Sequence, residues 1–149
     1  MSDPRQLSML AELAHERRDA AAKRLARAAA AHKESQSKLD LLERYREDYR
    51  QRLADAAAQG LAGDELRNFR MFLTRLDQAI EQQRAEAEAL LRGMNDCRTR
   101  WMSERRRERS FDVLVDRADL ATRQRDDRRV QKLMDEFAGR LAMLRASVG

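Results

Sequence analysis

Residues that could carry out chemistry are few and scattered in this sequence of 149 residues. Its two histidines, His15 and His32, are interpreted as isolated residues, and Cys97 is the single cysteine. We find no glycine-rich phosphate loop, no nucleophile elbow and no Cys/His cluster with metal-ligand spacing. Carboxylates are numerous, but a thin helical protein has no pocket to desolvate them. We therefore expect no enzyme activity, and no cofactor, metal ion or small-molecule substrate.

The remaining candidates are Trp101 and the basic run "SERRRERS" at residues 103–110. Helix packing is the favoured interpretation of Trp101, and an anchor for a partner is the alternative. The net charge of +5 and the basic run are typical of a solvated helical surface, although they could also meet an acidic partner. No aromatic residues interleave the run, so stacking of single-stranded nucleic acid is not predicted.

The composition predicts long helices. Charged residues make up 38% of the chain, and it contains one proline and five glycines. Each helix should then bury one apolar stripe. The N-terminus lacks the apolar region of a signal peptide, no stretch approaches a membrane span, and one cysteine allows no internal disulfide. We expect a soluble, cytoplasmic protein that forms a single coiled-coil domain over residues 1–149.

Apolar residues at alternating three- and four-residue steps predict a first helix over about residues 5–58. Arg18, Ser35 and Arg46 fill gaps in this imperfect heptad seam. Its other members are Leu7, Ala11, Ala14, Ala21, Leu25, Ala28, His32, Leu39, Leu42, Tyr49, Leu53 and Ala56. Within it, His32 is interpreted as a tolerated polar residue of the core.

A hinge at about residues 59–63 should separate this helix from a second one over about 64–144. Gly60 can adopt the left-handed conformation that ends a helix, and Asp64 can cap the next. Glu104 and Glu108 interrupt the second seam, and its frame slips after Thr122. The members of this seam are Leu66, Phe69, Leu73, Leu76, Ile80, Gln83, Ala87, Leu90, Met94, Cys97, Trp101, Phe111, Val115 and Ala118.

A short hinge makes the helices antiparallel neighbours, so residue i should face roughly residue 124 − i. Gly93 would then face the alanines at 28–31, where small residues allow close approach. The fold class is therefore all-α: an antiparallel coiled-coil hairpin whose second helix is longer. About 25 residues at the end of that helix have no partner, and we call this segment the overhang. It keeps an apolar stripe of Val130, Leu133, Met134, Phe137, Leu141 and Leu144.

A surplus apolar strip lies near the hinge, because Tyr45 is outside the first seam and Phe72 and Ala79 are outside the second. In the predicted register, Tyr45 and Tyr49 lie beside Phe72, Leu76 and Ala79. A shared strip of this kind on a polar protein typically marks a partner site. A wide seam or a self-association face is the alternative interpretation.

Several segments together resemble a known family. They are "LERYREDYRQRL" (42–53), "NFRMFLTRLDQAIEQQR" (68–84), Trp101 with its basic run, and "RRVQKLMDEFAGR" (128–140). Their order and spacing are similar to those of FliJ, a soluble component of the bacterial flagellar type III export apparatus. The resemblance implies a two-helix coiled coil like the central stalk of rotary ATP synthases.

The resemblance also implies partners and sites. The termini would enter the ring of the hexameric export ATPase, and the hinge-side region would bind the cytoplasmic part of the export gate membrane protein. Escort chaperones are further partners, and the protein would associate peripherally with the inner membrane at the flagellar base. The gate-binding residues would be Leu42, Tyr45, Tyr49, Phe72, Leu76 and Ala79, extended by Lys38 and Gln83. The ATPase-binding residues would be Gln131, Lys132, Asp135, Glu136 and Ala138, with Val130, Leu133 and Phe137 beside them.

Three alternatives remain open at the level of sequence. The first is the equivalent stalk of a virulence-type injectisome, which has the same mechanics. The second is a basic helical nucleic-acid-binding protein, whose affinity would fall steeply with salt. The third is a self-associating scaffold. The favoured reading has no nucleic-acid partner.

Overall fold

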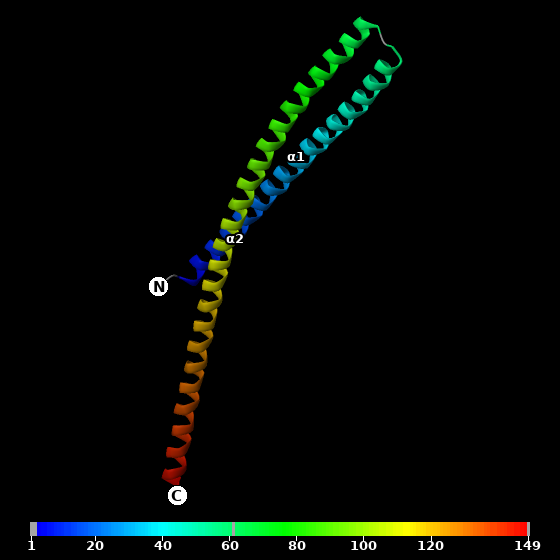
Figure 1. The fold of residues 1–149 in the computed structure, drawn as a ribbon. Helices are drawn as coiled ribbons and strands as arrows, with labels where there is room; N and C mark the ends of the chain where they lie inside the picture. Colours follow the sequence, from blue (N-terminus) through cyan, green and yellow to red (C-terminus); the bar gives the residue numbers. More distant parts are fainter. Residues whose placement is uncertain (1–2, 61, 149) are drawn as a thin grey trace. The chain divides into compact units, whose positions relative to one another are not determined.

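The computed structural model describes residues 3–60 and 62–148, and these form two helices, α1 (Pro4–Ala58) and α2 (Gly63–Val148) (Figure 1). No strand occurs within this part of the chain, and α2 is the longer helix, as predicted. Their ends lie close to the predicted ones, except that α2 continues beyond residue 144. None of the helices so described is long and apolar enough to cross a membrane.

Local chemistry explains where each helix begins and ends. Asp3 caps the N-terminal end of α1. Its carboxylate accepts a hydrogen bond from the Arg5 amide at 3.1 Å, and its carbonyl accepts one from the Leu7 amide. Gly60 has φ of 83°, which confirms the predicted left-handed residue after α1. Asp64 was predicted as a cap, but α2 already begins at Gly63. Asp64 therefore lies inside the first turn of α2, where its negative carboxylate interacts favourably with the positive end of the helix dipole.

Contacts divide the chain into two compact units. The hairpin unit, Asp19–Ser103, contains the hinge and the facing parts of α1 and α2. The terminal unit joins the residues up to Arg18 with those from Glu104 onward. The interpretation of the chain as one coiled-coil domain stays a prediction.

The core of the hairpin unit is a narrow seam. Leu39 on α1 and Leu76 and Ile80 on α2 are buried together, and Leu42 packs against them. The positions of both predicted seams are buried or half-buried, and this includes the polar ones. In the terminal unit, Leu7, Ala11 and Ala14 are buried on α1.

Two ion pairs fall close to the predicted register, whereas the hydrogen bonds between Ser35 and Gln83 join residues six positions away from it. Arg46 forms an ion pair with Asp77 in the hairpin unit, and His15 contacts Glu108 in the terminal unit. In both pairs the α2 residue lies within about one position of its predicted place. The expected close approach at Gly93 is wrong, because that glycine is exposed and a Cβ there would meet nothing within 4 Å. Gly93 therefore gains no packing from its missing side chain.

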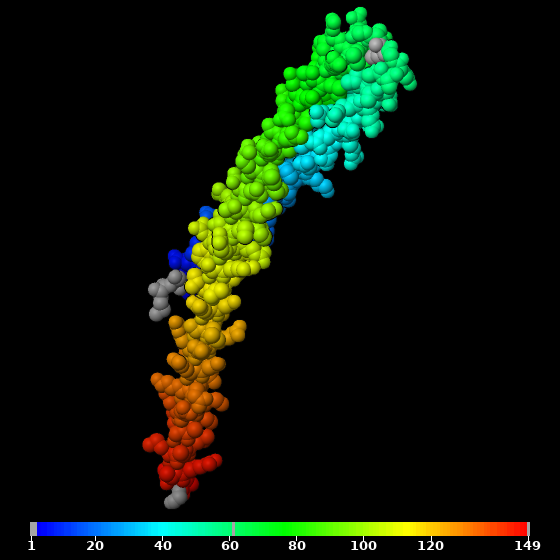
Figure 2. All heavy atoms as spheres, viewed as in Figure 1, coloured from blue at the N-terminus to red at the C-terminus, as the bar shows by residue number. Residues whose placement is uncertain are grey.

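The overhang is confirmed by exposure. Every residue from 119 to 148 is exposed, so the part of α1 that belongs to the terminal unit does not cover this end of α2. In Figure 2 the orange and red part of α2 carries side chains that project outward without a second helix over them. The overhang therefore covers residues 119–148 as one uncovered helix of the terminal unit.

Candidate interaction surfaces

The first candidate surface is the hairpin patch, which we define as Leu42, Tyr45, Tyr49, Phe72, Leu76 and Ala79, extended by Lys38 and Gln83. Aromatic rings hold its centre together: the ring centroid of Tyr49 lies 4.3 Å from that of Phe72 and 5.3 Å from that of Phe69. Tilted pairs at these separations are favourable beyond the area they bury. Tyr45 and Phe72 are 56% and 39% exposed, so the patch presents aromatic surface to solvent.

Three other members of the hairpin patch are buried beneath it or lie at its edge. Leu76 is buried in the core and therefore supports the patch rather than facing solvent. The Nε2 group of Gln83 donates to the carbonyl and to the hydroxyl of Ser35, at 3.1 and 2.9 Å. Lys38 is exposed and lies 3.8 Å from Glu34. The binding roles assigned to these residues stay predictions.

Sequence reasoning missed two exposed apolar residues near the patch. Leu41 is 62% exposed and Met71 is 51% exposed. Each adjoins a named member in sequence, and neither occupies a seam position. Their apolar character outside the seam was the available signal. Leu41 lies one turn before Tyr45 on the same side of α1, whereas Met71 lies about 100° around α2 from Phe72.

The second candidate surface is the overhang. Its large apolar side chains are uncovered, with Phe137 64% exposed and Leu144 62% exposed. Two shallow apolar grooves run along it, one lined by Val130, Leu133, Met134 and Phe137, the other by Leu141, Leu144, Arg145 and Val148. Grooves lined in this way can accept apolar side chains of a partner.

The polar residues of the overhang lie mostly on other sides of the helix. At 100° per residue, Lys132 and Asp135 fall far from the stripe that contains Val130, Leu133 and Phe137. Gln131 donates to Asp135 at 3.2 Å across one turn, which steadies both side chains. Gln131, Lys132, Asp135, Glu136 and Ala138 are all exposed. The predicted ATPase-binding residues therefore surround the helix.

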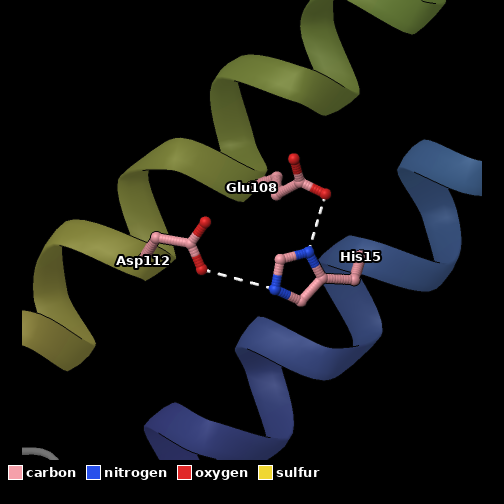
Figure 3. Close-up of side chains that lie close together, drawn as sticks. All are labelled: His15, Glu108 and Asp112. Carbon is pink, nitrogen blue, oxygen red and sulfur yellow. Dashed lines mark hydrogen bonds and ion pairs between the residues drawn. The ribbon is translucent and has the colours of Figure 1, made fainter.

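A third cluster lies in the terminal unit, where His15 of α1 meets Glu108 and Asp112 of α2 (Figure 3). The imidazole Nδ1 lies 2.8 Å from Glu108 Oε2, and Nε2 lies 3.4 Å from Asp112 Oδ1. The interpretation of His15 as isolated is thus wrong. The predicted register already placed it opposite residue 109, so the carboxylates on either side of that position were the signal.

Arg18 controls the charge of Glu108. Its Nε donates to Glu108 Oε2 at 2.7 Å, and this hydrogen bond lowers the pKa of the carboxyl below its usual 4.5. Partial burial acts in the opposite direction, and the contact with His15 lowers the pKa further. Glu108 is therefore ionised at neutral pH. One turn earlier, Glu104 has a buried Oε2 without a hydrogen-bond partner.

Comparisons with known proteins point to one family. The family model described as "Flagellar FliJ protein" matches residues 2–147. The Flagellar FliJ protein of Salmonella typhi is 30% identical over 137 residues, which cover 92% of this chain and 93% of that protein. The Flagellar FliJ protein of Escherichia coli (strain K12) is 27% identical over 143 residues, which cover 96% of this chain and 97% of that protein.

No solved structure matches the chain. The family model and the relatives, however, agree with one another and extend over both helices and the hinge. The paired seams, the longer second helix and the exposed overhang are all features of the matched region. This chain therefore belongs to the FliJ family of flagellar proteins.

Proposed function

We propose that this protein is a non-enzymatic stalk of the flagellar protein export apparatus. The overhang binds the hexameric export ATPase and promotes assembly and activity of its ring. The hairpin patch binds the cytoplasmic region of the export gate membrane protein, and so couples the ATPase to the gate. These two contacts hold a cytoplasmic protein at the inner membrane of the flagellar base, where it also meets export chaperones.

The observation that carries this proposal is the exposure of the overhang. A helix with an apolar stripe gains little stability alone, because its stripe stays in contact with water. Here the stripe includes Phe137 and Leu144, both more than half exposed. A partner that buries these side chains would recover their hydrophobic free energy, about 25 cal/mol for each Å² removed from water.

The arrangement of residues around the overhang favours an enclosing partner. Apolar grooves follow one side, while Lys132 and Asp135 lie on another. A flat partner surface would contact only one of these sides. The inside of a ring contacts all of them, which supports a ring-shaped partner such as the proposed export ATPase.

The hairpin patch supports the second contact. Tyr45, Phe72, Leu41 and Met71 present apolar surface on a hairpin whose other exposed residues are mostly charged. Tyrosine is frequent in such sites because its ring is apolar and its hydroxyl can stay hydrated. The Tyr49 ring fixes Phe72 in place, so part of the surface is ordered before any partner binds.

The test measures hydrolysis of ATP by the purified export ATPase with and without this protein. Leu133→Asp combined with Phe137→Asp places two charges on the apolar stripe. We expect the stimulation of hydrolysis to fall at least tenfold, because a buried unpaired carboxylate is costly. Deletion of residues 128–149 should abolish the stimulation.

The matched control is Arg125→Gln. This residue is exposed on the same overhang but lies away from the apolar stripe. It should keep stimulation within about twofold of the unmodified protein by the same assay, since surface substitutions are usually neutral. Stimulation that survives both the double substitution and the deletion would contradict the proposal.

A further inference from the structure

The ring of His15 lies between two carboxylates, and its two nitrogens differ in what they meet (Figure 3). The Nδ1–Glu108 distance of 2.8 Å is that of a hydrogen bond, whereas 3.4 Å from Nε2 to Asp112 is too long for a good one. A neutral imidazole has a single N–H. When Nδ1 donates that hydrogen to Glu108, Nε2 directs its lone pair toward a carboxylate oxygen.

Two electron-rich atoms separated in this way can share a cation. Zinc binds imidazole nitrogen and carboxylate oxygen at about 2.0–2.2 Å. Two such ligands 3.4 Å apart subtend an angle of about 110° at the ion, which is the tetrahedral value that zinc adopts. One ligand atom from each of His15, Glu108 and Asp112 lies within 4.8 Å of the others.

Glu108 fits a supporting position around such an ion. Metal-binding histidines usually donate their second N–H to a carboxylate, which fixes the tautomer and the orientation of the ring. Glu108 accepts from Nδ1 in this manner, and Arg18 holds its carboxylate from the other side at 2.7 Å. Glu104, one turn earlier, adds a buried carboxylate oxygen without a donor.

We propose that His15 Nε2 and Asp112 bind a divalent transition metal ion, taken as Zn²⁺, with Glu108 as a positioning residue. Mg²⁺ and Ca²⁺ prefer oxygen ligands alone, so a site with imidazole selects the transition metals. His15 and Asp112 are about half exposed, which leaves the other coordination positions open to water. The ion joins the start of α1 to α2 within the terminal unit.

Isothermal titration of the tag-free, full-length protein with Zn²⁺ tests the site. All variants carry Cys97→Ser, because a thiol is a zinc ligand in its own right. We expect one bound ion, no binding after His15→Ala, and at least tenfold weaker binding after Asp112→Asn. Glu108→Gln should weaken binding about tenfold, the usual effect of losing a supporting partner. His32→Ala, at the only other histidine, is the matched control and should bind as tightly as the parent.

A second measurement separates this geometry from simple attachment to a surface histidine. Nitrogen-15 spectra of the imidazoles should show Zn²⁺ shifting Nε2 of His15 while Nδ1 keeps its proton. Far-ultraviolet circular dichroism checks that each variant is still helical. Unchanged affinity after His15→Ala or after Asp112→Asn would overturn the proposal, as would coordination through Nδ1. An excess of Mg²⁺ should not displace the ion, and displacement would also count against the site.

Discussion

Ser35 and Gln83 form a hydrogen-bonded polar pair inside the seam between α1 and α2. Ser35 is 4% exposed, and both its hydroxyl and its carbonyl accept from the Gln83 amide. A buried polar group is costly unless it is hydrogen-bonded, and here one amide satisfies two acceptors. The pairing works only when α1 and α2 are in register at this level. A polar pair in a coiled-coil core can specify register in this way.

The ion pair of Glu108 makes one prediction about pH. Because the folded pKa lies below the unfolded value, Glu108 contributes stability at pH values above about 4.5 and loses it as pH falls through the folded pKa. The Glu108→Gln variant carries no such charge. We expect the melting temperatures of the parent and the variant to converge as pH falls from 7 to 3, measured by circular dichroism with a chelator present.

The control for this experiment is Asp116→Asn, a carboxylate one turn beyond Asp112 that is exposed. Its melting temperature should stay close to that of the parent at each pH. A gap between parent and Glu108→Gln that widens on acidification would mean that Arg18 does not stabilise the charged form.

At the level of elements, the two helices were predictable because their seams are periodic. Apolar residues and their polar interruptions fall on one side of each helix, so burial followed from spacing alone. The glycines were harder. Gly60 and Gly93 are the same residue type. Only their backbone angles distinguish Gly60, which follows the end of α1 with a positive φ, from Gly93, which lies inside α2. The predicted cap at Asp64 was likewise misplaced, by two positions, since α2 begins at Gly63 and caps depend on local backbone geometry.

Substitution of the two glycines by alanine should have opposite effects on stability. Gly60→Ala forces a side chain into the left-handed region and should cost about 1–2 kcal/mol. Gly93→Ala meets nothing within 4 Å and removes a flexible residue from the interior of α2, so it should stabilise by about 1 kcal/mol. Urea unfolding followed by circular dichroism measures both. Equal effects of the two substitutions would be inconsistent with these backbone assignments.

The overhang should exchange its amide hydrogens faster than the rest of α2. Helical hydrogen bonds that lack tertiary packing open without breaking the seam. We expect protection of residues 119–148 to be at least tenfold lower than that of the stretch around Ile80, which is buried. Hydrogen exchange with mass spectrometry measures the difference. Equal protection in both stretches would show that something covers the overhang.

At the scale of the whole molecule, sequence gave the candidate surfaces but not the state of each residue in them. Tyr45, Phe72 and Phe137 were expected to be available to partners, and all three are exposed. Leu76 and Gln83 were also expected to be available to partners. Leu76, however, is buried in the core, and Gln83 is hydrogen-bonded to Ser35. The contact between His15 and Asp112 was also missed. Such details depend on rotamers of facing residues, and periodicity carries no information about rotamers.

The two surfaces should be separable by mutation, because they use different residues of different units. Tyr45→Ala combined with Phe72→Ala removes exposed rings from the hairpin patch and leaves the overhang intact. We expect its affinity for the purified cytoplasmic region of the export gate protein to fall at least tenfold, while stimulation of the ATPase stays near normal. Surface plasmon resonance measures the affinity, and Arg50→Ala, an exposed residue of the same hairpin, is the control. The substitution at Phe72 also removes its contact with Tyr49, so thermal melting must show a folded hairpin. If gate binding and ATPase stimulation fell together in a folded variant, the two contacts would not be independent, and coupling would have to pass through one shared surface.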